Sequence, residues 1–327
     1  MPNRRQVLTG ACAAGIVGMP FVARRGFAQP GPRPTRFVFA YGAGGAGDGL
    51  ARVLASKMGD LLNGATIVEN KPGASGRIGT KAALTTDPDG TTLLFSPIAP
   101  ISMHPSIYPV LDYNPLTDAA PIAQLVTYDV CCVTNPALKL ATMADFVAWL
   151  KANPDKASCA MVGAGGIQYF LAGMLAKLVG VEIRPVYYRG NGAIMNDLTG
   201  GQVPFSFCIT SDATELHKAG KVRIIATSGS APSPLLNGVP TFKQAGYDLE
   251  GEGWYGLFAP AKVPAAKLAE LEKAALAVLA MSDVREKALG IGFTPTGVGA
   301  ADFAKIIRTD LAKWAPIIKD SGYKPAE

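Results

Sequence analysis

A glycine-rich turn between an apolar run and a helical pattern constrains the fold of this chain more than any other feature. Residues 37–50 read FVFAYGAGGAGDGL, with four glycines between positions 42 and 47 and then Asp48. A continuous apolar run is typical of a buried parallel strand, and glycines let backbone N–H groups approach a ligand closely. We expect Asp48 to cap the following helix, whose first turn attracts anions through free N–H groups and the helix dipole. The stretch therefore predicts an anion-binding strand, loop and helix.

The same pattern occurs a second time. A strand pattern at 158–162 is followed by glycines at positions 163, 165 and 166 and by a helical pattern at 169–178. Strands alternate with helices through much of the chain, which is typical of a parallel sheet. The 327 residues exceed what one hydrophobic core usually serves. The sequence therefore predicts an α/β fold of two domains with a ligand cleft between them.

Two long extended segments predict where the chain crosses between these domains. Residues 119–135 and 253–260 lack helical periodicity and are interpreted as strands. They predict a first domain made of residues 35–128 together with 255–327, and a second domain made of residues 129–254.

Three further segments complete the predicted order. Residues 97–109 are expected to form a loop at the carboxyl end of a strand, where open sheets bind ligands. The chain is expected to end in two amphipathic helices, at 265–279 and 301–319. The remaining strands are predicted at 36–41, 65–69, 91–96, 183–188, 204–210 and 222–227.

The first 28 residues predict a cleaved signal peptide. Arg4 and Arg5 precede an apolar run at residues 8–23, and a cleavage site is expected near Ala28. The twin arginines suggest the Tat route, and a basic start also fits the Sec route. The run is shorter than the roughly 20 residues of a membrane span. We therefore expect a periplasmic protein.

Composition narrows the class of ligand. Net charge is +6 with no block of Lys and Arg, which argues against nucleic acid and suits an anionic small molecule. After cleavage the cysteines Cys131, Cys132, Cys159 and Cys208 remain, without metal-ligand spacing. We interpret them as small buried apolar residues, with the adjacent pair on opposite faces of a strand. The sequence predicts no metal site and no cofactor.

A series of short motifs runs through the mature chain in a fixed order. They are ENKPGA at 69–74, DPDGTTLL at 87–94, PSIY at 105–108, VYYRG at 186–190, DLTGGQV at 197–203, AGKVR at 219–223, VPT at 239–241 and WYGLFAP at 254–260. Together they resemble the receptors of tripartite tricarboxylate transporters, the Bug family of extracytoplasmic binding proteins. Each motif is weak alone, and the ordered series over most of the chain is specific.

This resemblance implies a two-domain periplasmic-binding-protein type II fold that binds a small carboxylate and catalyses nothing. The partner would be a membrane permease of a tripartite transporter or a sensor kinase, and a monomer is expected. By position, the implied ligand-binding residues are Tyr41, Gly44, Gly45, Asp48, Ser96, Ala99, Ser102, Gly163, Ala164, Gly165, Gly166, Gln168, Arg189 and Cys208.

Two of these positions carry specific expectations. Cys208 stands where many family members have Asp, which favours a purely anionic or apolar-tailed acid over one that carries an amine. Arg189 is expected to pair either with a ligand carboxylate or with an acid of the opposite domain.

One alternative stays open at this point. The glycines at 42–47 also fit G-x-G-x-x-G, and Glu69 follows about 20 residues later, as in dinucleotide-binding folds. This pattern suggests an exported NAD(P)-dependent oxidoreductase. Against it, His104 and His217 are the only histidines, and neither has an evident catalytic partner in the sequence. His104 is expected to line the cleft and His217 to lie on a helix.

Overall fold

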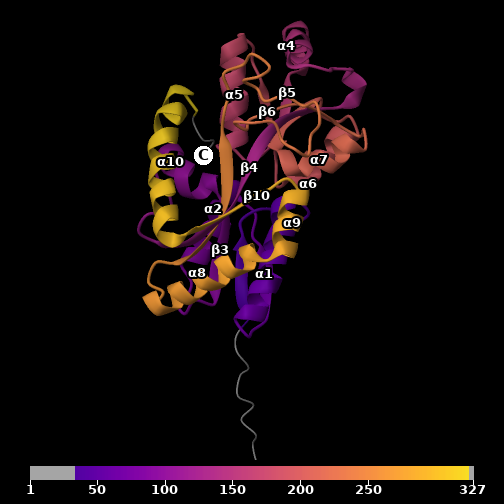
Figure 1. Cartoon of the computed structure of the whole chain (residues 1–327). Helices are drawn as coiled ribbons and strands as arrows, with labels where there is room; N and C mark the ends of the chain where they lie inside the picture. The colour runs from indigo at the N-terminus through magenta and orange to yellow at the C-terminus, as the bar shows by residue number, and fades with distance from the viewer. Residues whose placement is uncertain (1–33, 324–327) are drawn as a thin grey trace, which may run out of the picture. The chain divides into compact units, whose positions relative to one another are not determined.

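The structure of the protein, a computed structural model, describes residues 34–323 (Figure 1). The predicted signal peptide lies outside the described residues. Among the helices described, none is both long and apolar enough to cross a membrane. Within the same part of the chain, no group of three or more His, Cys, Asp or Glu side chains is placed to hold a metal ion.

The first half of the fold is a sheet with the strand order β2-β1-β3-β9-β4. Strands β1 (Thr35–Phe39), β2 (Thr66–Asn70) and β3 (Thr92–Pro97) are parallel, and β9 (Glu252–Pro260) runs antiparallel to β3. Between these parallel strands the chain forms helices α1 (Ala46–Leu61) and α2 (Arg77–Leu84). All six positions of β3 are buried, as the apolar pattern predicts for a central strand.

The second half repeats this arrangement around β5 (Ser158–Val162), which pairs in parallel with β6 (Arg184–Tyr188) and β7 (Phe205–Ile209). The helices between and after these strands are α5 (Ile167–Val179), α6 (Asn191–Thr199) and α7 (Thr210–Lys218). Strand β8 (Arg223–Thr227) pairs with β4, and helix α4 (Met143–Ala152) precedes β5. Thr142 caps α4 through a capping box with Asp145.

The long strand β4 (Ala119–Thr134) belongs to both halves. It pairs with β9 from Ala119 to Asp129 and with β7 from Val130 onward. Both extended segments of the sequence are therefore confirmed as strands, and the predicted α/β fold class is confirmed. The change of partner at Asp129 supports the predicted domain limits, which stay a prediction.

Two predicted segments differ from the structure. Residues 97–109 are not an open loop, because Ala99–Met103 forms one π-helical turn and α3 follows at His104–Ile107. The end of the chain contains α8 (Ala265–Ala280) and α10 (Ala300–Asp320), with α9 (Ser282–Gly290) and β10 (Thr294–Gly299) between them. The sequence reading missed α9 and β10, which are short and have at most intermediate burial over most of their length. Both α8 and α10 pack against β4 (Figure 1).

Candidate functional site: a cavity between the two half-sheets

A cavity of about 50 Å³ lies where strands of both halves end. Its lining includes the first glycine loop, the turn after β3, the second glycine loop after β5, and the residues after β6. Tyr128 of β4 and Tyr255 of β9 complete the wall. Carboxyl ends of parallel strands are where open α/β sheets bind ligands. The volume suits a small molecule of a few heavy atoms or a short row of waters.

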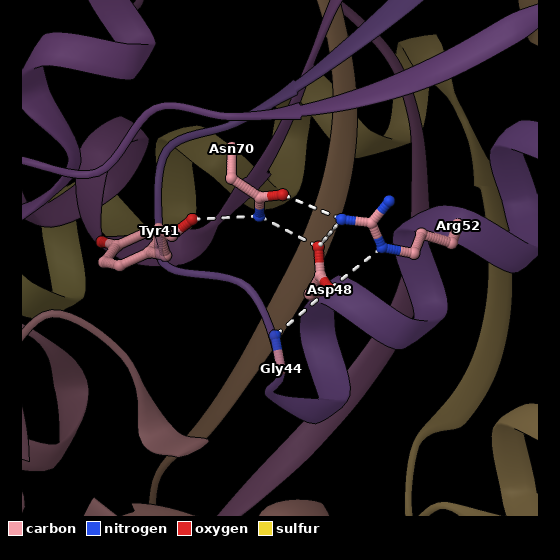
Figure 2. A network of polar contacts seen from close by, with 5 residues as sticks. All are labelled: Tyr41, Gly44, Asp48, Arg52 and Asn70. Atoms are coloured by element: carbon pink, nitrogen blue, oxygen red, sulfur yellow. Dashed lines mark hydrogen bonds and ion pairs between the residues drawn. The ribbon is translucent and has the colours of Figure 1, made fainter. Parts of the chain in front are cut away.

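The first glycine loop leads into α1, whose N-cap is Gly45. The expectation that Asp48 caps this helix is therefore wrong, since Asp48 lies inside the first turn. Its carboxylate instead holds the loop from within (Figure 2). Oδ2 accepts hydrogen bonds from Gly44 N–H at 3.2 Å and Arg52 Nε at 3.0 Å. Oδ1 accepts from Arg52 Nη2 at 3.0 Å and from Asn70 Nδ2 at 2.9 Å.

Asn70, from the ENKPGA motif, joins this network to the preceding strand. Its Nδ2 also donates to the Tyr41 carbonyl at 3.1 Å, and its Oδ1 accepts from Arg52 at 3.0 Å (Figure 2). Burial alone would raise the pKa of Asp48, but the bonds from Arg52, Asn70 and Gly44 outweigh it and leave the pKa below its usual value. Asp48 is therefore ionised and compensated, so its charge does not exclude an anion.

The backbone amides of the first loop are only partly available. Gly44 donates to Asp48, and Ala46 N–H donates to Asp212 Oδ1 at 2.6 Å. The N–H groups around the helix start, expected to be free for an anion, are therefore already bonded at these two residues. The N–H groups of Gly45, Gly47 and Asp48 make no hydrogen bond to another described residue. They remain at the positive end of the α1 dipole.

The second glycine loop has a different construction. Gly163 and Gly165 have φ of +61° and +74°, a backbone that other residues rarely adopt, and Gly166 is the N-cap of α5. Its Ala164 N–H donates to Ser75 Oγ of the first half at 2.9 Å. Ser75 is itself left-handed, with φ of 56°, and its carbonyl accepts from the Tyr41 hydroxyl at 3.2 Å.

Three direct hydrogen bonds therefore join the two halves around the cavity. Besides the bonds from Ala46 to Asp212 and from Ala164 to Ser75, Gly42 N–H donates to the Arg189 carbonyl at 3.2 Å. These contacts describe a closed cleft.

Packing around α1 explains one glycine of the first loop. A Cβ at Gly47 would meet the Tyr255 hydroxyl at less than a possible contact distance, since the ring lies directly against the helix start. Tyr255 stacks on Phe95 of β3 with ring centroids 4.8 Å apart, which fixes its position. Gly47 is therefore needed so that a tyrosine can reach the first turn of α1.

The predicted site residues divide into three groups. Those that line the cavity are Tyr41, Gly45, Asp48, Ala99, Ala164, Gly166 and Gln168. Gly163 and Arg189 line a neighbouring hollow, together with Tyr41 and Ala164. Gly44, Ser96, Ser102, Gly165 and Cys208 line neither.

Cys208 needs correction, and Arg189 needs it in part. Cys208 is fully buried, with its Sγ 3.7 Å from Cys131 Sγ as a free thiol. Arg189 makes no ion pair with any described residue, so the domain-bridging pair is not found, and its pairing with a ligand carboxylate stays a prediction. All four mature cysteines are buried and free, which confirms their interpretation as small apolar residues, and Cys131 and Cys132 belong to different clusters on opposite faces of β4.

Four residues near the cavity were missed in the sequence. Asp212 and Asn191 follow β7 and β6, while Ser75 and Tyr128 come from the first half and from β4. The signal available for Asp212 and Asn191 was their place just after parallel strands. Burial raises the pKa of Asp212 to about 6, although the bonds from Ala46 and Asn191 lower it.

Two half-sheets closed over a small cavity define a solute-binding protein of the periplasmic-binding class. The chain belongs to the family described as tripartite tricarboxylate transporter family receptor, whose profile matches residues 50–323. It is 29% identical over 317 residues to protein BugT of Bordetella pertussis, covering 94% of this chain and 97% of BugT. The resemblance found in the sequence is therefore confirmed. These proteins are receptors rather than enzymes, which sets the oxidoreductase alternative aside.

Solved structures agree with this family. The periplasmic binding protein BugD is 29% identical, with a TM-score of 0.86 over 90% of this chain and 99% of BugD. MatC from Rhodopseudomonas palustris, solved with bound malate, is 25% identical, with a TM-score of 0.83 over 87% of this chain and 98% of MatC. The predicted two-domain binding-protein fold is confirmed by this likeness.

Proposed function

We propose that this protein is a periplasmic receptor that holds a small carboxylate in the cavity and closes on it by hinge motion. The observation that carries the proposal is the convergence of two helix N-termini, those of α1 and α5, on one cavity between the halves. Helix N-termini attract anions, and a small carboxylate fits the volume. The malate bound by MatC supports the same ligand class.

The carboxylate would take its hydrogen bonds mainly from backbone. Gly45 and Gly47 on the first wall, and Gly166 and Gln168 on the second, have amides without a bond to another described residue. Within the lining no Lys or Arg side chain is present, so charge is balanced by dipoles rather than by a dedicated cation.

The family description suggests which membrane protein would receive the ligand from this receptor. We propose a tripartite-type membrane permease as the partner, and a sensor kinase as the second candidate. The family description supports the transporter, and the predicted signal peptide supports the periplasmic location. A bacterial two-hybrid or pull-down assay between this receptor and the membrane subunits of a tripartite-type transporter from the same organism would test the first proposed partner.

A thermal-shift screen of small carboxylic acids tests the ligand class. An acid present at 100 times its Kd should stabilise the fold by about 2.7 kcal/mol, which raises Tm by roughly 5 °C. Amines without a carboxylate, together with NAD and NADP, serve as controls and should leave Tm unchanged. A broad acid panel without any shift, or a shift with the nucleotides alone, would contradict the proposed function.

A further inference from the structure

Two residues on the cavity wall carry acceptor atoms that no donor reaches. His104 Nε2 and Asn191 Oδ1 are both buried, and neither has a hydrogen-bond partner within the described residues. A buried acceptor without a donor costs about 1–3 kcal/mol, and such atoms are rare in folded proteins. Since both residues line the cavity, a bound ligand is placed to supply what they lack.

The hydrogen-bond chain around His104 fixes which ring nitrogen is the acceptor. Its Nδ1 lies 3.3 Å from the Tyr113 hydroxyl oxygen, and that hydroxyl donates to the Pro100 carbonyl at 2.9 Å. With the single hydroxyl hydrogen given to the shorter contact, the one to the Pro100 carbonyl, the assigned tautomer carries its proton on Nδ1 and donates to Tyr113. Nε2 is then a free lone pair at the cavity.

The His104 ring also stays neutral. Its side chain is fully buried, and burial, with a smaller effect from Arg77, lowers the pKa of His104 to about 3. At neutral pH the ring therefore cannot act as a cation for the ligand's carboxylate. It offers an acceptor only.

Asn191, on the opposite wall of the cavity, carries the second unpaired acceptor. Its side chain lowers the pKa of Asp212, and its own Oδ1 is buried and has no donor among the described residues. Asp212 Oδ2 is buried and has no partner among the described residues either. This side of the cleft therefore carries an unpaired carbonyl oxygen and a buried carboxyl oxygen that also lacks a partner.

We propose that His104 and Asn191 select, among small carboxylic acids, those that also carry a hydrogen-bond donor, either a hydroxyl or an ammonium group. The inference rests on the proposed function, since it concerns the same cavity. An acid without such a donor leaves both acceptors unpaired, and a second carboxylate oxygen would set lone pair against lone pair. This proposal differs from the expectation, drawn from Cys208, of a purely anionic or apolar-tailed ligand.

Matched ligand sets test this directly by calorimetry on the dialysed mature protein. Each set keeps one carbon skeleton and changes one group: propionate, lactate and alanine; succinate, malate and aspartate; glutarate, 2-hydroxyglutarate and glutamate. In the set whose length fits, a donor-bearing member should bind about tenfold or more tighter than the donor-free acid. His104→Phe keeps a buried ring and removes Nε2, so it should reduce this preference to about threefold or less. Asn191→Leu should reduce it in the same direction.

Further variants separate the two donor types and control for folding. If the donor is ammonium, Asp212→Asn should weaken the amine-bearing member more than the hydroxyl-bearing one; if it is hydroxyl, the ratio of their two affinities should change by no more than about twofold, whatever the variant does to closure. His217→Phe alters the other histidine, which accepts from Ile224 N–H away from the cavity, and should leave the preference intact. Donor-free acids that bind within threefold of their counterparts would overturn the inference and leave the receptor function standing. If no acid binds at all, the proposed function itself fails.

Discussion

The two glycine loops face the same cavity, yet they are held in opposite ways. The first loop is fixed by its own half, because Asp48, Arg52 and Asn70 form a bonded network that ties it to α1 and β2 (Figure 2). Among the described residues the second loop has no comparable side-chain network, and the hydrogen bond that it makes to a side chain crosses the cleft from Ala164 to Ser75. The first loop therefore has a side-chain network within its own half in addition to its two bonds across the cleft, whereas the second has the backbone bond from Gly163 N–H to the Tyr188 carbonyl at 3.2 Å in its own half and gains its side-chain bond on closure. A receptor built this way captures its ligand on one wall and completes the site with the other.

Among the changes that distinguish the two loops, Asp48→Ala should cause the largest loss of stability. The change removes four accepted hydrogen bonds and leaves Arg52 and Asn70 without their partner. Arg52 is half exposed, so water compensates part of the loss, and we expect the free energy of unfolding to fall by about 2–3 kcal/mol. Urea denaturation of the ligand-free protein measures this.

Asp302→Ala is a matched control, because Asp302 pairs with Lys305 on the exposed face of α10 and should have little effect. The pKa of Asp48 is lowered in the folded state, so its contribution is present at neutral pH and is lost as the pH falls through that lowered pKa. The wild type should therefore lose stability relative to Asp48→Ala in acid. An unchanged unfolding curve for the variant at neutral pH would show that the first loop is not held by this network.

A smaller effect, of opposite sign in pH, is expected across the cleft at Asp212. Burial raises its pKa to about 6, so the closed folded state takes up a proton at higher pH than the unfolded chain does. Stability of the closed form therefore falls as pH rises from about 4 to 6, by about 1–2 kcal/mol. The groups that face Asp212 are Tyr128, Tyr255 and Cys208, whose pKa values are all raised, so they stay neutral over this range.

Asp212→Asn should remove this share of the pH dependence and raise Tm at pH 7, as measured by thermal unfolding between pH 4 and 8. Asp129 has its pKa raised to about 6 as well, by burial and by Glu252, so part of the slope will persist. Asp129→Asn serves as the paired control, since it should remove the other part without altering ligand binding. If the stability of Asp212→Asn depends on pH as steeply as that of the wild type, Asp212 is not the source of this pH dependence.

The sequence predicts the fold class and the buried strands, but it does not predict the tertiary contacts between them. Continuous apolar runs and glycine turns located β1, β3 and β5 within a residue or two, because burial on both faces leaves a strong local signal. Strand β10 was not predicted, because it contains two glycines and is only half-buried, which leaves no strand pattern in the sequence. Its pairing with β4 is a tertiary contact that local pattern does not encode.

The candidate site shows the same division. Tyr41, Gly45 and Gln168 reach the cavity because they follow strands, and strand ends can be read from sequence. Asp212 reaches the α1 N-terminus only because two halves distant in sequence close on each other. The prediction that Cys208 contacts the ligand is wrong for a local reason. Its position on β7 places the side chain in the core beside Cys131.

The smallest effect tests the second loop and decides whether the comparison holds. Ser75→Ala removes the acceptor of the Ala164 amide, a contact that exists only when the halves are closed. We expect ligand affinity to fall about fivefold, equivalent to about 1 kcal/mol, with the free energy of unfolding of the ligand-free protein within about 0.5 kcal/mol of wild type. Ser56→Ala, at an exposed position of α1, is the control and should change neither quantity. If Ser75→Ala instead lowers stability and leaves affinity intact, the cross-cleft bond belongs to the resting fold, and both loops are preformed.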